Sequence, residues 1–176
     1  QTHLMAGLVY ARELLISGEI ELFATHCGEL EQGINRVADR PTRNRLAGEL
    51  ELVYMIAKFN DIAAMSGHVH QAAGLLTEAS GLCDPDTPWT FGSPSILYMF
   101  YRESGALERE TQELAAAMPL YCKLTAGHGR GADSIMQAER HYYLGDFDNA
   151  EIIGHKALRE AELGRQTGNV ICALFL

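Results

Sequence analysis

A break of two residues recurs four times along this chain, each time after a stretch with a helical hydrophobic period. The breaks lie 42, 45 and 40 residues apart, at Gly18-Glu19, Asn60-Asp61, Gly105-Ala106 and Gly145-Asp146. An apolar residue follows two positions after the first residue of each pair: Ile20, Ile62, Leu107 and Phe147. A small or apolar residue follows twelve positions after it: Leu30, Ala72, Ala117 and Ala157. Units of this length cannot bury their own apolar stripe, so the recurrence predicts stacked helical hairpins.

The last unit carries the clearest form of the pattern. Its sequence reads G-D-F-D-x-A-x6-A from Gly145 onward, which matches a tetratricopeptide repeat, although that repeat usually spans about 34 residues. We expect Gly145-Asp146 to form a tight turn, with Asp146 capping the second helix and Phe147 anchoring the turn. The small residues Ala150 and Ala157 should let the two helices approach closely.

Almost every other segment also has a helical period, and none alternates as a strand would. The sequence therefore predicts an all-α fold, a right-handed solenoid of stacked antiparallel helical hairpins that resembles tetratricopeptide repeats. We expect one such unit over residues 1–176. Its hairpins should lie at about 3–36, 41–81, 94–123 and 131–163, with the start of a further helix at 165–176.

The ends of the chain suggest that it is a piece of a longer one. The first residue is Gln1, and the last seven residues are all apolar, whereas natural termini usually end in polar, frayed residues.

Composition narrows the class of protein. The net charge of −9 and the lack of a basic stripe argue against contact with nucleic acid. The four cysteines show no C-x-x-C spacing, which favours a reducing compartment, and no segment has the length and hydropathy of a signal peptide or a membrane span. We therefore expect a cytoplasmic protein without membrane contact.

Residues 83–94 interrupt the helical hydrophobic period. They hold three of the five prolines and the only tryptophan, and five of the fourteen aromatic residues lie between Trp89 and Tyr101. We interpret the segment as an ordered linker between two pairs of hairpins, followed by a helix with Ser93 as its N-cap and Pro94 in its first turn.

This linker and the residues after it form one candidate binding group. Trp89 and Phe91 with Arg102 and Glu103 supply an aromatic surface and two charges, which could bind a sugar or a small polar effector. The alternative is structural: the aromatic residues fill the gap between hairpin pairs, and the two charged residues tie down a helix end.

A glycine-rich segment, residues 127–131, forms a second candidate group with His128 and Arg130. It lacks the strand of a dinucleotide-binding fingerprint and the Lys-Ser/Thr of a P-loop. It is either a flexible joint before a helix that starts near Ala132, or an anion or ligand contact through Arg130 and the free amides of that helix start. The candidate ligand-binding residues are thus Trp89, Tyr98, Arg102, Glu103, His128 and Arg130.

No catalytic or metal site stands out. His68 and His70 lie two apart on a predicted helix, and neither has a carboxylate or cysteine at i+4, so we expect a solvated face and no metal. No nucleophile has a recognisable partner, and Glu49-Leu-Glu51 and Glu108-Arg-Glu110 read as exposed helix faces. We expect no enzyme activity and no cofactor.

Four strings carry a resemblance to a known family: FNDIAAMS (59–66), WTFGSPSILYMFYRESG (89–105), LTAGHGRGAD (124–133) and the closing hairpin. Over roughly residues 10–176 the chain resembles the helical-repeat region of large LuxR-type transcriptional regulators, relatives of the maltose-regulon activator. The resemblance implies an ATP-binding module before the repeats, a helix-turn-helix domain after them, and a repeat region that senses an effector and supports oligomerisation. The motifs of neither flanking domain occur here, and no effector-contacting residue of the family maps onto a clear motif.

Two functions remain open at this point. In the first, the chain is the effector-sensing and oligomerisation segment of a cytoplasmic LuxR-type regulator, and a small molecule in its groove shifts the regulator between assemblies. In the second, it is a general interaction scaffold that binds a peptide or partner domain without a small molecule. A closed pocket with Trp89 and Arg102 at its floor favours the first. An open polar trough, or an apolar face buried against a second copy, favours the second.

Overall fold

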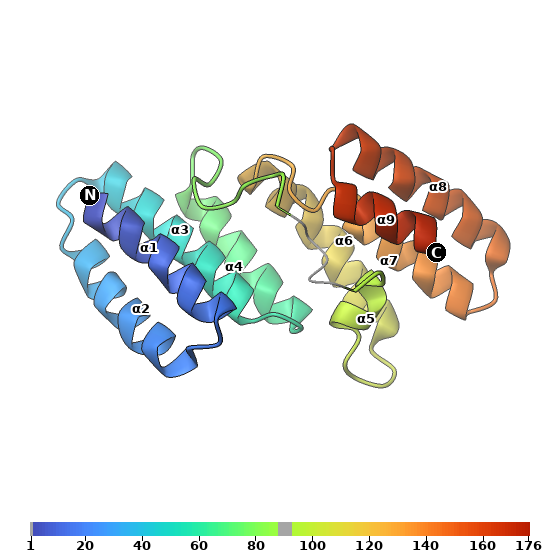
Figure 1. Cartoon of the computed structure of the whole chain (residues 1–176), viewed down its shortest axis with the longest axis horizontal. Helices are drawn as coiled ribbons and strands as arrows, with labels where there is room; N and C mark the ends of the chain where they lie inside the picture. The colour runs from blue at the N-terminus through green and yellow to red at the C-terminus, as the bar shows by residue number, and fades with distance from the viewer. Residues whose placement is uncertain (1, 88–92) are drawn as a thin grey trace.

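The computed structural model describes residues 2–87 and 93–176, and every regular element in them is an α-helix (Figure 1). This confirms the predicted all-α class. The helices are α1 (Thr2–Ile16), α2 (Ile20–Asn35), α3 (Arg40–Ala57), α4 (Ile62–Leu75), α5 (Ile96–Phe100), α6 (Leu107–Leu124), α7 (Ala132–Tyr143), α8 (Phe147–Leu163) and α9 (Thr167–Phe175).

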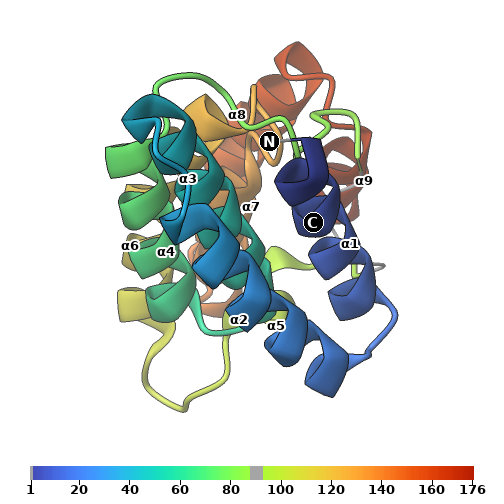
Figure 2. The same cartoon turned by 90° about the vertical axis from the view of Figure 1, so that its left-hand side faces the viewer.

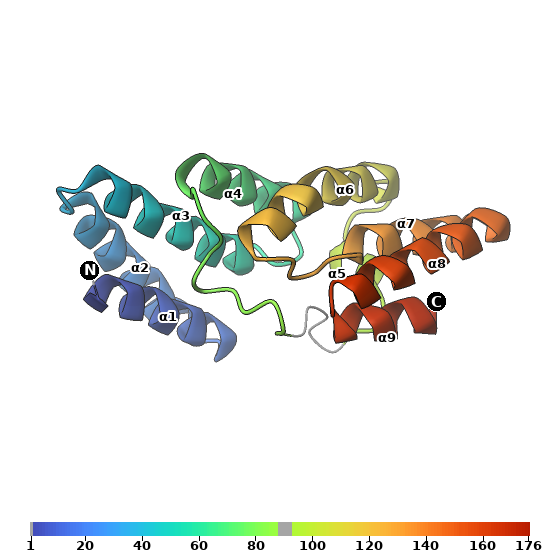
Figure 3. The same ribbon diagram turned by 90° about the horizontal axis from the view of Figure 1, so that it is seen from above.

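The helices are arranged as an elongated arch. Helices α1 and α2, α3 and α4, and α7 and α8 pack as neighbouring pairs, and α6 contacts both α4 and α7 and so joins the two halves. Seen from above, α4 and α6 lie along one side, while α1 and α9 lie on the other side at opposite ends (Figure 3). The end-on view shows α1 and α2 nearest the reader, with α7, α8 and α9 behind (Figure 2). The described part of the segment that follows α4, residues 76–87, runs between the two halves (Figure 3).

The recurring breaks are the turns between helices. Their first residues all adopt a left-handed backbone, with φ of 80° at Gly18, 80° at Asn60, 83° at Gly105 and 78° at Gly145. Glycine and asparagine reach this region at the lowest steric cost. The apolar residues two positions later begin α2, α4, α6 and α8. The residues twelve positions after each break are at most 4% exposed and lie in the core.

Side-chain caps set several helix starts. Asp39 accepts a hydrogen bond from the amide of Thr42 at 2.9 Å, with Pro41 in the first turn, and Asp146 accepts one from the amide of Asn149 as predicted. The cap predicted at Ser93 is wrong. Helix α5 begins two residues later, and Ser95 is its N-cap because its hydroxyl accepts from the amide of Tyr98 at 3.1 Å.

Phe147, the predicted turn anchor, is not buried, and neither is Ile20, which follows the first break at the same position. Phe147 is 62% exposed and Ile20 is 58% exposed, whereas Ile62 is only 6% exposed. The ring of Phe147 lies edge-on to Tyr142 with centroids 5.6 Å apart, so it covers the outside of the turn. The anchoring role predicted for Phe147 is therefore wrong. The close approach of α7 and α8 depends on the buried Ala150 and Ala157 instead.

Helix α8 also packs closely against the turn before α7. Gly131 has φ of 92°, and a Cβ atom there would lie 3.0 Å from the carbonyl oxygen of Ala157 and 3.3 Å from the amide nitrogen of Ala161. The chain can therefore approach α8 only because residue 131 lacks a side chain.

Gly131→Ala is expected to lower the free energy of unfolding by about 2 to 4 kcal/mol, because left-handed strain of about 1 to 2 kcal/mol adds to this clash. Gly145→Ala is the matched control, since Gly145 has φ of 78° but no atom within 4 Å of the added Cβ. Gly145→Ala should lower the free energy of unfolding only by the cost of the left-handed strain. Urea unfolding measures both, and equal losses would contradict the close approach to α8.

Candidate functional site

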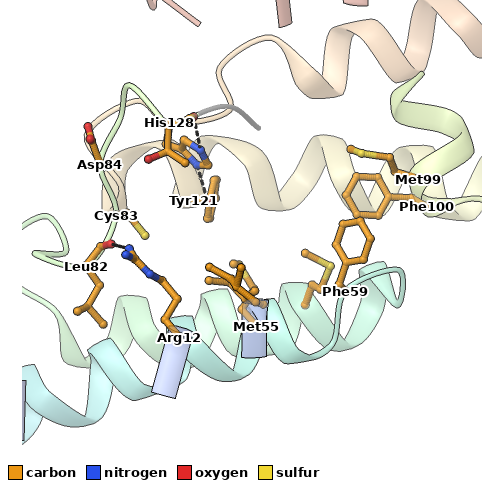
Figure 4. A pocket seen from close by; sticks show the side chains of 14 residues that line it. Arg12, Met55, Phe59, Leu82, Cys83, Asp84, Met99, Phe100, Tyr121 and His128 are labelled. Carbon is orange, nitrogen blue, oxygen red and sulfur yellow. Dashed lines mark hydrogen bonds between the residues drawn. The ribbon is translucent and has the colours of Figure 1, made fainter. Parts of the chain in front are cut away.

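A mainly apolar cavity of about 190 Å³ lies between the two halves of the arch. Side chains from α1, α3 and α4 line one wall, and side chains from α5, α6 and the two connecting segments line the other (Figure 4). The described lining residues are Arg12, Ile16, Met55, Ile56, Phe59, Met65, Leu82, Cys83, Asp84, Thr87, Met99, Phe100, Tyr121 and His128. Their separation in sequence means that only the folded arch assembles this site.

One end of the cavity is apolar and adaptable. Met55, Met65 and Met99 line it with Phe59 and Phe100, and the two phenylalanine rings have centroids 6.3 Å apart. Figure 4 shows these aromatic rings and Met99 at the end away from Arg12. Unbranched methionine side chains change rotamer easily and fit irregular apolar ligands. A cavity of about 150 Å³ holds a benzene-sized molecule, so this one is large enough for a small aromatic or short aliphatic group.

The other end is polar and holds a permanent positive charge. Arg12 donates from Nη1 to the carbonyl oxygen of Leu82 at 2.6 Å and from Nη2 to Glu13 Oε1 at 3.1 Å, and Arg12 Nε has no hydrogen-bond partner among the described residues. Asp84 lies at the same end. An arginine can form paired hydrogen bonds with a carboxylate, so this end suits an acidic or carbonyl group of a ligand.

His128 is fixed in one neutral form at this polar end. Its Nε2 lies 3.0 Å from the carbonyl oxygen of Thr87, and its Nδ1 lies 2.7 Å from the hydroxyl of Tyr121. Burial lowers the pKa of His128 and raises the pKa of Tyr121, so both are neutral at pH 7. A carbonyl only accepts, so Nε2 carries the proton and donates to Thr87, while Nδ1 accepts from Tyr121. His128 therefore links Thr87, in the segment that follows α4, to Tyr121 of α6.

A buried carboxylate holds the segment that forms the polar end. Glu49 is fully buried, and it accepts hydrogen bonds from the hydroxyl of Ser80 and, at 2.8 Å, from the amide of Gly81. The Ser80 hydroxyl also accepts from the amide of Leu82 at 3.0 Å. The prediction that Glu49 lies on an exposed helix face is wrong, because this face of α3 is covered by the segment that follows α4.

A second buried carboxylate holds α5 in place. Glu139 of α7 accepts a hydrogen bond from the amide of Leu97 at 2.7 Å and so satisfies a donor at the start of α5. Burial raises the pKa of Glu139. Helix α5 supplies Met99 and Phe100 to the cavity, so Glu139 positions part of its wall. Nothing in the sequence near Glu139 signals this role.

Two of the predicted ligand-binding residues line a separate, open cleft of about 480 Å³ between α4 and α6. Arg102 donates from Nη1 to the carbonyl oxygen of Tyr98 at 2.9 Å, and Glu103 pairs with Arg109 at 2.8 Å. Both contacts tie together the chain around α5 and the start of α6. In the same cleft Glu110 is only 7% exposed, so its predicted place on an exposed face is wrong, whereas Glu108 is exposed as predicted.

The remaining predicted residues lie elsewhere. Trp89 and Phe91 fall outside the described residues. Tyr98 is 64% exposed and Arg130 is exposed, and neither lines the apolar cavity or the open cleft. The structure thus places His128 in the apolar cavity and Arg102 with Glu103 in the open cleft. It does not bring the five described candidates into one site.

The glycine-rich segment is fixed at its centre. The amide of Gly129 donates to the side-chain oxygen of Gln166 at 2.7 Å, and the carbonyl of Gly129 accepts from the side chain of Asn169 at 3.0 Å. The amide of Ala132 donates to the same carbonyl at 3.1 Å. Two of the amides that an anion site would need are therefore already engaged within the protein.

Several other features bear on the class of protein. Within residues 2–87 and 93–176, no three histidine, cysteine or acidic side chains are grouped so as to hold a metal ion. His68 instead contacts Glu51 across two helices, with Nδ1 and Oε2 2.7 Å apart. The four cysteines are free thiols. Among the helices described, none has both the length and the apolar character to cross a membrane.

No family model, curated protein or solved structure matches this chain.

Proposed function

We propose that this chain is the effector-sensing segment of a cytoplasmic LuxR-type transcriptional regulator related to the maltose-regulon activator. Its hairpins would form a tetratricopeptide-like right-handed solenoid that supports oligomerisation and carries no catalytic activity. An ATP-binding module and a helix-turn-helix domain of the same protein would be its partners. The resemblance in four sequence strings supports this assignment, and so do the four turns of one geometry at recurring intervals.

The observation that carries the sensing role is the cavity between the two halves of the arch. Its walls come from both halves, so a bound molecule contacts α1 and α3 on one side and α5 and α6 on the other. A ligand that prefers one relative placement of the halves shifts the population toward it. The apolar end and Arg12 together favour a small, mainly apolar effector with a carboxylate or carbonyl at one end.

A thermal-shift screen with small aromatic and short aliphatic carboxylic acids tests this proposal. A ligand that binds only the native state raises the free energy of unfolding by about 2.7 kcal/mol at a hundred times its Kd. Benzoate should stabilise the chain more than benzyl alcohol, because only the acid pairs with Arg12. Arg12→Met should weaken benzoate binding about tenfold, which corresponds to one charge-assisted hydrogen bond, and leave benzyl alcohol unchanged.

Arg159→Met is the matched control, because Arg159 is exposed on α8 and away from the cavity. It should bind benzoate as the unchanged chain does. Each variant is compared with its own ligand-free midpoint, since Arg12→Met also removes the hydrogen bond to Leu82 and the ion pair with Glu13. Equal affinity in both variants, or no stabilisation by any acid in the screen, would contradict a sensor with Arg12 in its site.

A second candidate, a protein-interaction scaffold, is favoured by the apolar surface of α8 and α9. A shallow groove there is lined by Tyr142, Phe147, Leu158 and Leu174, and Leu174 is 69% exposed. Apolar patches of this kind mark protein contacts. An absence of stabilisation by every small molecule, together with binding of a flanking domain, would move the assignment to this scaffold role.

A further inference from the structure

The open cleft between α4 and α6 contains two oxygen atoms without a donor. Glu110 Oε2 and Asn60 Oδ1 are both buried, and neither has a hydrogen-bond partner among the described residues. Both residues line this one cleft. A buried acceptor without a donor costs about 1 to 3 kcal/mol, so two of them in one cleft call for a ligand that donates.

The charged side chains around these atoms indicate the sign of the ligand's charge. Four carboxylates line the cleft, from Asp61, Glu103, Glu110 and Glu113, against the two guanidinium groups of Arg102 and Arg109. Arg102 donates a hydrogen bond to the carbonyl of Tyr98, and Arg109 pairs with Glu103 of the same cleft. Burial raises the pKa of Glu110 and outweighs the positive charges of Arg109 and Arg102 and a backbone hydrogen bond from Arg102, all of which lower it. The cleft therefore favours a cation.

The shape and composition of the cleft favour an organic cation over a metal ion. The carboxylates do not converge as metal ligands, since no metal-binding group of three such side chains exists in the part of the chain described. The cleft of about 480 Å³ is far larger than a metal ion needs. Phe59 also lines it, and an aromatic ring attracts an ammonium group that lies over its face.

We propose that this cleft binds a small primary ammonium ion, with Glu110 as its counter-ion and Asn60 as a hydrogen-bond acceptor. The ammonium group supplies up to three N–H donors, which match the two oxygens that lack them. The ion pair of Arg109 and Glu103 in the same cleft is 68% and 71% exposed at its two side chains, so it can separate at little cost as the ligand enters.

This site is separate from the apolar cavity, although Phe59 contributes to both. The apolar cavity offers a cationic arginine to an acidic ligand, whereas the cleft offers carboxylates to a cation. The cation site therefore does not depend on the proposed function, and each can fail without the other.

Isothermal titration calorimetry with butylammonium chloride tests the proposal. We expect saturable binding that weakens about tenfold in Glu110→Gln, which keeps the shape of the side chain and removes its charge. Asn60→Gly should weaken binding to a similar degree. Glycine is the appropriate replacement because Asn60 has φ of 80°, which alanine would adopt only with strain. Glu151→Gln on the exposed face of α8 is the control and should bind as the unchanged chain does.

Two further ligands separate charge from hydrogen bonding. Tetramethylammonium carries the charge without N–H donors, and its affinity should be lower and unaffected by Asn60→Gly. Butanol carries neither and should not bind. The proposal is overturned if butylammonium gives no saturable heat, or if both cleft variants bind it within a factor of two of the unchanged chain. A crystal structure with butylammonium that shows an ordered water only at the two oxygens would also overturn it.

Discussion

Glu49→Ala is expected to lower the free energy of unfolding by about 3 to 5 kcal/mol, because it leaves the buried hydroxyl of Ser80 and the partly buried amide of Gly81 without an acceptor. The carboxylate accepts from the hydroxyl of Ser80 and the amide of Gly81, and it is fully buried. Alanine cannot accept a side-chain hydrogen bond, and water cannot replace the oxygens without opening the contact between α3 and the segment that follows α4. Urea unfolding measures the loss.

The same substitution should disturb the polar end of the cavity. The Ser80 hydroxyl accepts from the amide of Leu82, and the Leu82 carbonyl in turn accepts from Arg12. Loss of Glu49 therefore loosens the contact that positions Arg12. Hydrogen exchange at the amides of Gly81 and Leu82 should speed up more than exchange in α8, which lies in the other half of the arch.

Two variants make the Glu49 prediction specific. Glu151→Ala removes a carboxylate that is 77% exposed on α8 and should change stability by less than about 0.5 kcal/mol. Glu49→Gln keeps one acceptor oxygen and should fall between the two. If Glu49→Ala is as stable as Glu151→Ala, the proposed anchoring of the segment after α4 by Glu49 is incorrect.

The sequence predicted the all-α class and the four breaks between helices because those signals are local. Gly18, Asn60, Gly105 and Gly145 favour a left-handed turn wherever they occur, and Asp146 caps the helix that follows it. Such features depend on neighbours within a few residues, so they can be recognised without knowing the fold.

The burial of three carboxylates could not be predicted from local signals. Glu49, Glu110 and Glu139 read as polar positions of amphipathic helices, yet each is at most 7% exposed. Helix α3 packs against α1, α2 and α4, and α7 packs against α5, α6, α8 and α9, so these helices have little solvated surface. Where several faces are covered, a single apolar stripe no longer marks the buried side.

The candidate site was predictable only in part. His128 was singled out and lines the apolar cavity, but Arg12, Met55 and Phe100 were not. These residues become neighbours through the packing of α1, α3 and α5, and no spacing along the chain relates them. Arg102 and Glu103 were singled out for their charge, and they lie instead in the open cleft with Glu110.

Phe100→Ala is expected to cost about 3 to 5 kcal/mol of stability, because the ring is 1% exposed and packs in the core beside the apolar end of the cavity. Part of that cost is the loss of apolar transfer energy, and part is the added void, which the short helix α5 can only partly fill. Urea unfolding of the variant measures the sum.

Phe147→Ala is the matched control, since it removes the same ring from a position that is 62% exposed. It should lose less than about 1 kcal/mol, as expected for a surface contact with Tyr142. Similar losses in the two variants would mean that Phe100 is not part of a packed core, and that the cavity wall formed by α5 is not a fixed structure.

Ligand binding can distinguish the two contributions to the stability loss of Phe100→Ala, the added void and the lost apolar transfer energy. The space left by Phe100→Ala adjoins the existing cavity, so toluene should bind the variant more tightly than the unchanged chain and recover part of the lost stability. Toluene should not stabilise Phe147→Ala, whose missing ring leaves only open surface. If toluene stabilises Phe100→Ala no more than the unchanged chain, the surrounding methionines have closed the void, and the cavity is more adaptable than a preformed sensor site requires.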